Sequence, residues 1–102
     1  MKRSIAGVFA AASIAGCAFA PQHFALLDEA RAAADEAAAD LDVIRFAATE
    51  LGRARDTLEQ ALAARDTLQD PALVEHLAYL ARQRVAIARE AAALEVARAA
   101  RP

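Results

Sequence analysis

The sequence predicts an all-α protein, an antiparallel hairpin of alanine-rich helices that pack in the manner of a coiled coil. Three observations support this fold class. Alanine dominates the composition after residue 17 and β-branched residues are few, which favours helix over strand. Apolar residues recur at alternating intervals of four and three along two long segments. A clear stop, Asp70-Pro71, separates these segments and allows the second to fold back on the first.

Residues 1–16 have the form of a lipoprotein signal peptide. A basic dipeptide, Lys2-Arg3, precedes an uncharged apolar run that is too short to span a bilayer. The run ends in Ile-Ala-Gly-Cys at residues 14–17, which resembles the lipobox of bacterial lipoproteins. The resemblance implies that the peptide is cut between Gly16 and Cys17 and that the cysteine then carries fatty chains.

Cys17 is the only cysteine, so it has no partner for an internal disulfide in the oxidising compartment to which the signal leads. Acylation removes the reactive thiol and supplies an anchor, because two or three fatty chains hold firmly where one is marginal. Ala18 stands where an Asp would favour the inner membrane, and the resemblance to Gram-negative lipoproteins therefore implies the periplasmic face of the outer membrane. The alternative is a structural thiol in an ordinary apolar N-terminus.

Residues 17–25 are expected to form the lipidated N-terminus and a short tether, because Pro21 disfavours helix just before it. The predicted hairpin domain covers residues 26–101 and is helical from its start. Asp and β-branched residues then interrupt the helix-forming pattern. They leave two alternatives: one continuous helix, or a break between Asp40 and Thr49 that gives three helical segments in all.

A second long helix is expected from Pro71 to about Ala100, because Asp70 is a favourable N-cap and proline suits the first helical position. Its predicted buried stripe consists of Leu73, Leu77, Leu80, Ile87, Ala91 and Leu94, with Arg84 in the remaining position. The preceding helix offers Ile44, Leu51 and Leu58, with Ala47, Ala54 and Ala61 three residues beyond each. Folding about Asp70 would place large residues opposite alanines, for example Leu80 opposite Ala61.

The composition argues against nucleic-acid binding and against catalysis. Removal of the signal leaves ten basic residues against fourteen acidic ones, without a basic patch. The mature chain has no serine, and Thr49, Thr57 and Thr67 lie in helices, where hydroxyls face solvent or bond their own backbone. His23 and His76 lack a second ligand three or four residues away, so we expect no metal. We also expect no other cofactor and no enzymatic activity.

Three residues are candidate contacts for a partner. Arg55 and Arg84 fall on the two apolar stripes at matching heights of the hairpin. Their stems either cover apolar surface while the guanidinium groups reach water, or the two form a polar layer that sets the register or binds an acidic partner. Tyr79 is expected in the core or at a dimer contact.

Residues 46–51, Phe-Ala-Ala-Thr-Glu-Leu, with the Ala and Leu residues at 54, 58 and 61, resemble the core signature of a bacterial helical family called domain of unknown function 4398. In that family a Tyr-Ala-Pro-x-Glu-Leu segment precedes spaced Ala and Leu, and Thr49 stands where proline is common. Leu80-Ala81, Ala88 and Ala91-Ala92 are similar to its second alanine-rich helix. The resemblance covers residues 26–98. It implies a periplasmic lipoprotein, and the family has no established catalytic residues.

These features suggest an outer-membrane-anchored periplasmic lipoprotein that is a non-catalytic structural or protein-interaction module of the cell envelope. Its expected partners are the membrane, through lipid on Cys17, and a second copy or an envelope protein, because so thin a hairpin is marginal alone. The alternative is an accessory or ligand-binding subunit of an envelope enzyme or transporter, with an acidic group beside Arg55 and Arg84. Since Pro102 is last in the sequence, no covalent link to peptidoglycan through a C-terminal lysine is expected.

Overall fold

The computed structural model describes residues 23–102. The predicted signal peptide, its cleavage site between Gly16 and Cys17, and the tether up to residue 22 lie outside the described residues. The all-α class is confirmed in the described part of the chain. Its helices are α1 (Ala25–Ala38), α2 (Leu41–Phe46), α3 (Ala48–Asp66) and α4 (Pro71–Ala99).

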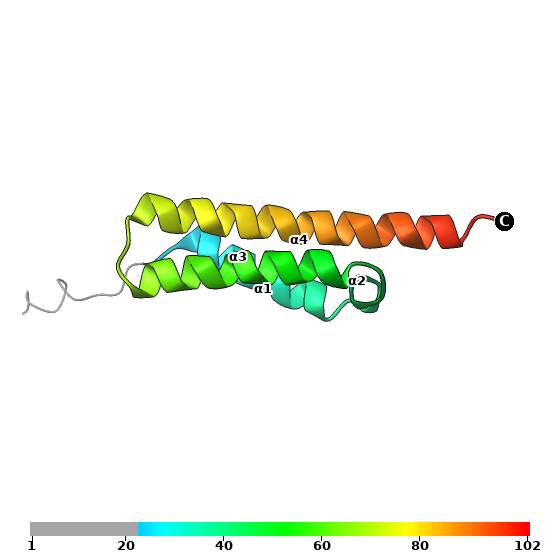
Figure 1. Cartoon of the computed structure of the whole chain (residues 1–102), viewed down its shortest axis with the longest axis horizontal. Coiled ribbons are helices and arrows are strands. Elements are labelled where there is room, and N and C mark those ends of the chain that lie inside the picture. Colours follow the sequence, from blue (N-terminus) through cyan, green and yellow to red (C-terminus); the bar gives the residue numbers. More distant parts are fainter. Residues whose placement is uncertain (1–22) are drawn as a thin grey trace, which may run out of the picture.

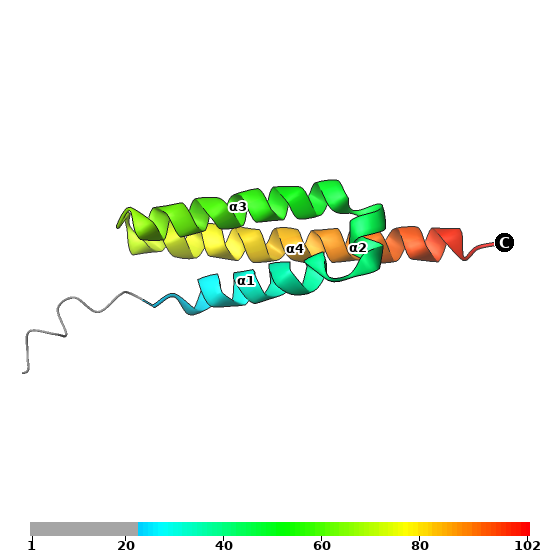
Figure 2. The same cartoon turned by 90° about the horizontal axis from the view of Figure 1, so that it is seen from below.

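Three long helices lie side by side (Figures 1 and 2). α3 runs antiparallel to α4, which is the predicted hairpin, and α1 lies beside them in the same direction as α4. α2 is a short connection at the end of the bundle where α1 stops and α3 begins. α4 continues past α2, so its last turns extend beyond the other helices.

α1 begins at Ala25, and the residue before it already belongs to the core. Phe24 has extended backbone, is buried, and packs in one cluster with Leu27 and Val74. The predicted tether of residues 17–25 is therefore too long by two residues at its C-terminal end. Burial of an aromatic ring gives a large apolar stabilisation, and this holds the start of α1 against α4.

The first helical stretch is broken, as the second of the two alternatives expects, but it is broken twice, so the described part of the chain has four helices where that alternative predicts three segments. After α1 ends at Ala38, Asp40 caps α2 by accepting a hydrogen bond from the Asp42 amide at 2.9 Å. The backbone leaves the helical conformation again at Ala47 (φ −138°, ψ 32°), and α3 follows. Asp favours such cap positions because its carboxylate replaces a missing backbone acceptor. The breaks allow α1 to lie against both α3 and α4.

The stop between α3 and α4 forms as predicted. Asp70 accepts a hydrogen bond from the Ala72 amide at 3.0 Å, and the proline between them occupies the first helical position. At the end of α3, Leu68 adopts a left-handed conformation with φ 57°. The Gln69 amide donates to the Ala64 carbonyl at 2.9 Å, which is the six-to-one hydrogen bond of a Schellman motif. The reversal is therefore capped on both sides.

The predicted stripe on the first half of the hairpin is largely correct. Ala47, Leu51, Ala54 and Ala61 are buried, and Leu58 is half-buried. Ile44 is the exception, because it lies in α2 with its side chain exposed.

The predicted stripe on α4 is wrong by one residue. The buried positions are Val74, Ala78, Ala81, Val85, Ala88 and Ala92. Each follows a predicted position directly, which corresponds to a rotation of about 100° around the helix axis. The pairing of Leu80 with Ala61 is therefore not the core contact; Ala61 instead shares a cluster with Val74 and Ala78.

α1 accounts for the rotation of α4. α4 buries the residues that face both of its long neighbours, and these are mostly alanines. Ala34 of α1, Ala54 of α3 and Ala88 of α4 meet in one cluster, where small side chains let the helix backbones approach closely. The third helix thus supplies part of the burial that the sequence analysis expects from a partner.

Candidate functional site

The residues displaced from the core of α4 form an apolar surface, which we call the outer stripe. Its members recur every seven residues and are Leu73, Leu80, Ile87 and Leu94. Leu73 is 39% exposed, Ile87 55% and Leu94 51%, while Leu80 is half-buried. Arg82 and Arg89 reach α1 from positions two residues after Leu80 and Ile87, a rotation of about 200°. The outer stripe therefore lies on the side of α4 away from α1.

Arg84 lies beside the outer stripe and links α4 to α3. Its Nη1 donates a hydrogen bond to Thr57 Oγ1 at 2.8 Å, and that hydroxyl donates to the Arg53 carbonyl at 3.1 Å. Thr57 is only 3% exposed, whereas the Arg84 side chain reaches the surface. One buried hydroxyl thus forms the polar contact between the two helices. Arg84 corresponds to the polar-layer alternative more closely than to a simple surface arginine.

A hollow of about 200 Å³ opens next to Arg84 between α3 and α4. It is lined by Glu50, Arg53, Arg84 and Ile87. Two guanidinium groups, one carboxylate and an aliphatic side chain therefore surround a space of side-chain size. Because the lining residues are exposed or half-buried, the hollow suits a side chain of a docking protein better than an enclosed small molecule.

The three predicted contact residues are not gathered at one place. Arg55 is exposed on α3, Tyr79 is half exposed on α4, and neither lines the hollow beside Arg84. The guanidinium that does line it with Arg84 belongs to Arg53. The hollow beside Arg84 is therefore not shared with Arg55. Contact of each residue with a partner stays a prediction.

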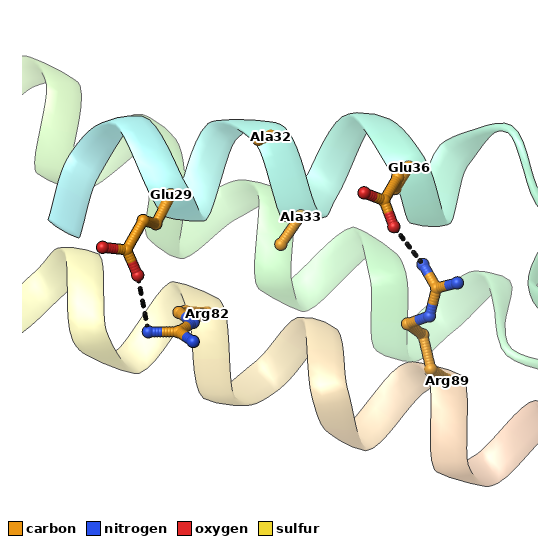
Figure 3. A pocket seen from close by; sticks show the side chains of 6 residues that line it. All are labelled: Glu29, Ala32, Ala33, Glu36, Arg82 and Arg89. Atoms are coloured by element: carbon orange, nitrogen blue, oxygen red, sulfur yellow. Dashed lines mark ion pairs between the residues drawn. The ribbon is translucent and has the colours of Figure 1, made fainter. Parts of the chain in front are cut away.

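A second, shallower hollow of about 400 Å³ lies between α1 and α4 (Figure 3). It is lined by Glu29, Ala32, Ala33, Glu36, Arg82 and Arg89. Arg82 Nη1 lies 2.7 Å from Glu29 Oε1. Arg89 lies 3.8 Å from the Glu36 carboxylate and 3.9 Å from that of Asp40. The ion pairs of Glu29 with Arg82 and of Glu36 with Arg89 span this hollow, so they help to hold α1 against α4.

Sequence reasoning identified Arg84 but not the residue that binds it. Thr57 does bond its own backbone, as expected, but it is also buried and accepts the hydrogen bond from α4. The position of Thr57 could have indicated this role. Thr57 lies three residues after Ala54 and directly before Leu58, which places it at the edge of the buried stripe. Glu50 and Arg53 were likewise missed as neighbours of Arg84, because the predicted register of α4 was wrong.

Residues 23–102 show neither a bilayer-spanning helix nor a metal-ligating cluster. None of the helices there combines the length and apolar character needed to cross a bilayer. The same residues include no cluster of three or more His, Cys, Asp or Glu that could ligate a metal.

Comparison with known protein families identifies the domain. A family model described as a domain of unknown function, DUF4398, matches residues 25–101. No curated protein and no solved structure shows significant similarity to the chain. The matched range runs from the first residue of α1 to the end of α4, so the family domain coincides with the helical bundle.

Proposed function

The chain belongs to the DUF4398 family, a domain of unknown function, and on that premise we propose that it is a non-catalytic interaction module of the bacterial cell envelope. Fatty chains on Cys17 hold it at the periplasmic face of the outer membrane, and its helical bundle contacts another protein. The observation that carries the interaction role is the outer stripe, where large apolar side chains face away from the bundle on the longest helix.

The anchoring role is supported by the sequence at residues 14–17 and by the shortness of the chain that follows. Five residues lie between Cys17 and His23, the first described residue, so six residue-to-residue steps join the two. Even when fully extended, six residues reach only about 22 Å. A lipidated Cys17 would thus keep the bundle close to the membrane surface, where other envelope proteins are within reach.

The non-catalytic role is supported by the chemistry of the described side chains. Thr57 and Thr67 direct their hydroxyls to carbonyls of their own helix. The charged residues in the hollow between α1 and α4 pair with one another. The arrangement therefore offers contact surfaces in place of an activated nucleophile with its base.

The anchoring role is tested by expressing the full chain in a Gram-negative host and analysing the membrane-bound product by mass spectrometry. We expect cleavage before Cys17 and a mass increase corresponding to diacylglycerol on the thiol and usually a further chain on the new amine. A Cys17→Ser variant should remain uncleaved and unmodified. A bare thiol at Cys17, or an uncut N-terminus in the parent, would contradict the proposal.

Localisation is tested with the same material by density separation of the two membranes. The parent should accompany outer-membrane markers. Ala18→Asp should shift the protein to the inner membrane, because the residue after the lipidated cysteine directs sorting in the lipoproteins that the chain resembles. Equal distribution of both variants would argue against the outer-membrane assignment while leaving lipidation intact.

A further inference from the structure

The outer stripe is one half of a second heptad pattern on α4. With Leu77, Arg84 and Ala91 between its members, it repeats at intervals of four and three from Leu73 to Leu94. The buried stripe follows the same pattern one residue later. α4 therefore has two registers, about 100° apart on the helix. The buried register packs against α1 and α3. The outer register has the spacing of a coiled-coil seam: Leu77 and Ala91 pack against the edge of the core and Arg84 bonds α3, whereas Leu73, Ile87 and Leu94 are exposed.

Exposure of the apolar side chains of the outer register to water is unfavourable. Ile87 and Leu94 each expose more than half of their surface, and the α4 segment beyond Ala92 has no residue in the core. The bundle does not need these side chains, because its clusters are completed by alanine and valine from α4. A sustained apolar repeat outside a complete core indicates a second helix that packs upon it.

We propose that this helix is α4 of a second copy of the same chain, packed antiparallel about a two-fold axis between Val85 and Ala86. The axis places the following residues of the two copies opposite one another: Leu77 and Leu94, Leu80 and Ala91, Arg84 and Ile87. Each layer combines one large aliphatic side chain with a partner that is apolar or has an aliphatic stem. The inference deepens the proposed function by naming the partner, and it is independent of lipidation at Cys17.

Charge favours the antiparallel arrangement. Parallel pairing in register would place Arg84 of one copy against Arg84 of the other, and like charges in contact oppose association. In the antiparallel pair Arg84 meets Ile87 of the second copy, while Thr57 holds its guanidinium toward α3.

The hollow between α3 and α4 fits the same arrangement. It lies beside Arg84 and Ile87, next to the centre of the proposed seam, and measures about 200 Å³. This is enough room for a branched aliphatic side chain from the second copy to enter between Arg53 and Arg84. The two-fold axis repeats the contact, so the hollow of each copy is filled by the other.

Cysteine cross-linking of the full chain tests the arrangement in membranes. Leu80→Cys and Ala91→Cys chains, co-expressed and oxidised, should give a disulfide-linked dimer that each variant alone does not give. In the antiparallel pair two copies of position 80 lie about 16 Å apart along the axis, too far for a disulfide. Efficient cross-linking of Leu80→Cys alone would overturn the antiparallel arrangement, and absence of cross-linking in the mixture would overturn the seam.

Tyr79→Cys is the matched control, since it lies at the height of Leu80 but is rotated by about 100°. Mixed with Ala91→Cys, it should give at least about tenfold less dimer than Leu80→Cys does, and equal yields would contradict a specific seam. Adding Ile87→Asp to the cross-linking pair should reduce the yield by a similar factor, because a charge would enter the central layer. Circular dichroism of the variants establishes that their helices are retained.

Cross-linking of the parent chain distinguishes failure of this proposal from failure of the proposed function. Its only cysteine is Cys17, so a cross-linked parent would reveal an unmodified thiol and contradict lipidation. The cross-linking of Leu80→Cys with Ala91→Cys would then be repeated in chains that also carry Cys17→Ser, so that any disulfide reports only on the seam. Each proposal can therefore fail while the other stands.

Discussion

At the residue scale, the most informative side chain is Thr57. A threonine in the middle of a helix ordinarily bonds its own backbone, and Thr57 does so through Arg53. The same oxygen accepts the hydrogen bond from Arg84, 27 residues later, in a site that is nearly closed to solvent. The pair fixes the height of α4 relative to α3, because an alanine core alone tolerates sliding of one helix along the other.

Replacing Thr57 by valine tests this contact with little change in shape. The variant should lower the free energy of unfolding by about 1 kcal/mol, since a hydrogen bond from a charged donor is lost but the exposed guanidinium can return to water. Thr57→Ser retains the hydroxyl and should fall closer to the parent. Urea denaturation followed by circular dichroism measures the difference. Equal stability of the valine variant and the parent would show that this hydrogen bond does not stabilise the contact between α3 and α4.

At the element scale, α1 is the helix most dependent on polar contacts. Its buried residues are Leu27 and the alanines Ala30, Ala34 and Ala37, so it contributes little large apolar surface. It is tied to α4 by the pairs of Arg82 with Glu29 and of Arg89 with Glu36, both of them partly exposed (Figure 3). Each such pair contributes little, but together they align two parallel helices whose contact is otherwise made of methyl groups.

The double variant Arg82→Gln, Arg89→Gln should therefore loosen α1. We expect a loss of about 0.5–1.5 kcal/mol in unfolding free energy at low salt. Near 1 M salt the difference from the parent should be smaller, because screening weakens these ion pairs in the parent itself. Arg31→Gln removes a charge from the exposed face of α1 and serves as the control. A salt-independent difference would assign the effect to lost packing of the arginine stems.

At the scale of the whole molecule, stability is unevenly distributed along α4. The core clusters span its length from Val74 to Ala92, whereas the turns beyond Ala92 pass the end of the bundle. Leu94 and Val96 are exposed there, and an ion pair joins Arg98 to Glu95 within this extension. In a single copy, these turns are stabilised only by the hydrogen bonds within α4 itself. Helical turns without tertiary contacts are marginally stable in water.

Amide hydrogen exchange should reveal this division. In the Ile87→Asp variant, amides of residues 94–100 should exchange far faster than those of residues 78–92, because local fraying opens them without unfolding the core. In the parent, protection of residues 94–100 should rise with protein concentration as the second copy covers Leu94. Concentration-independent exchange in the parent would mean that the extension has no partner copy under those conditions.

From the sequence, the break at Asp40 could be predicted only as one of two alternatives. The sequence was sufficient to predict the helical class, the cap at Asp70 and the stripe of α3, because these follow from local propensity and from one unambiguous apolar pattern. It also singled out Arg84. Which register of α4 enters the core was decided only by tertiary structure. Apolar residues occupy adjacent positions along that helix, so two stripes one residue apart compete. The alanine-rich one is buried because α1 and α3 approach α4 closely only over small side chains, and this leaves the leucines outside. The same rotation sets Arg84 beside Thr57 and Arg53.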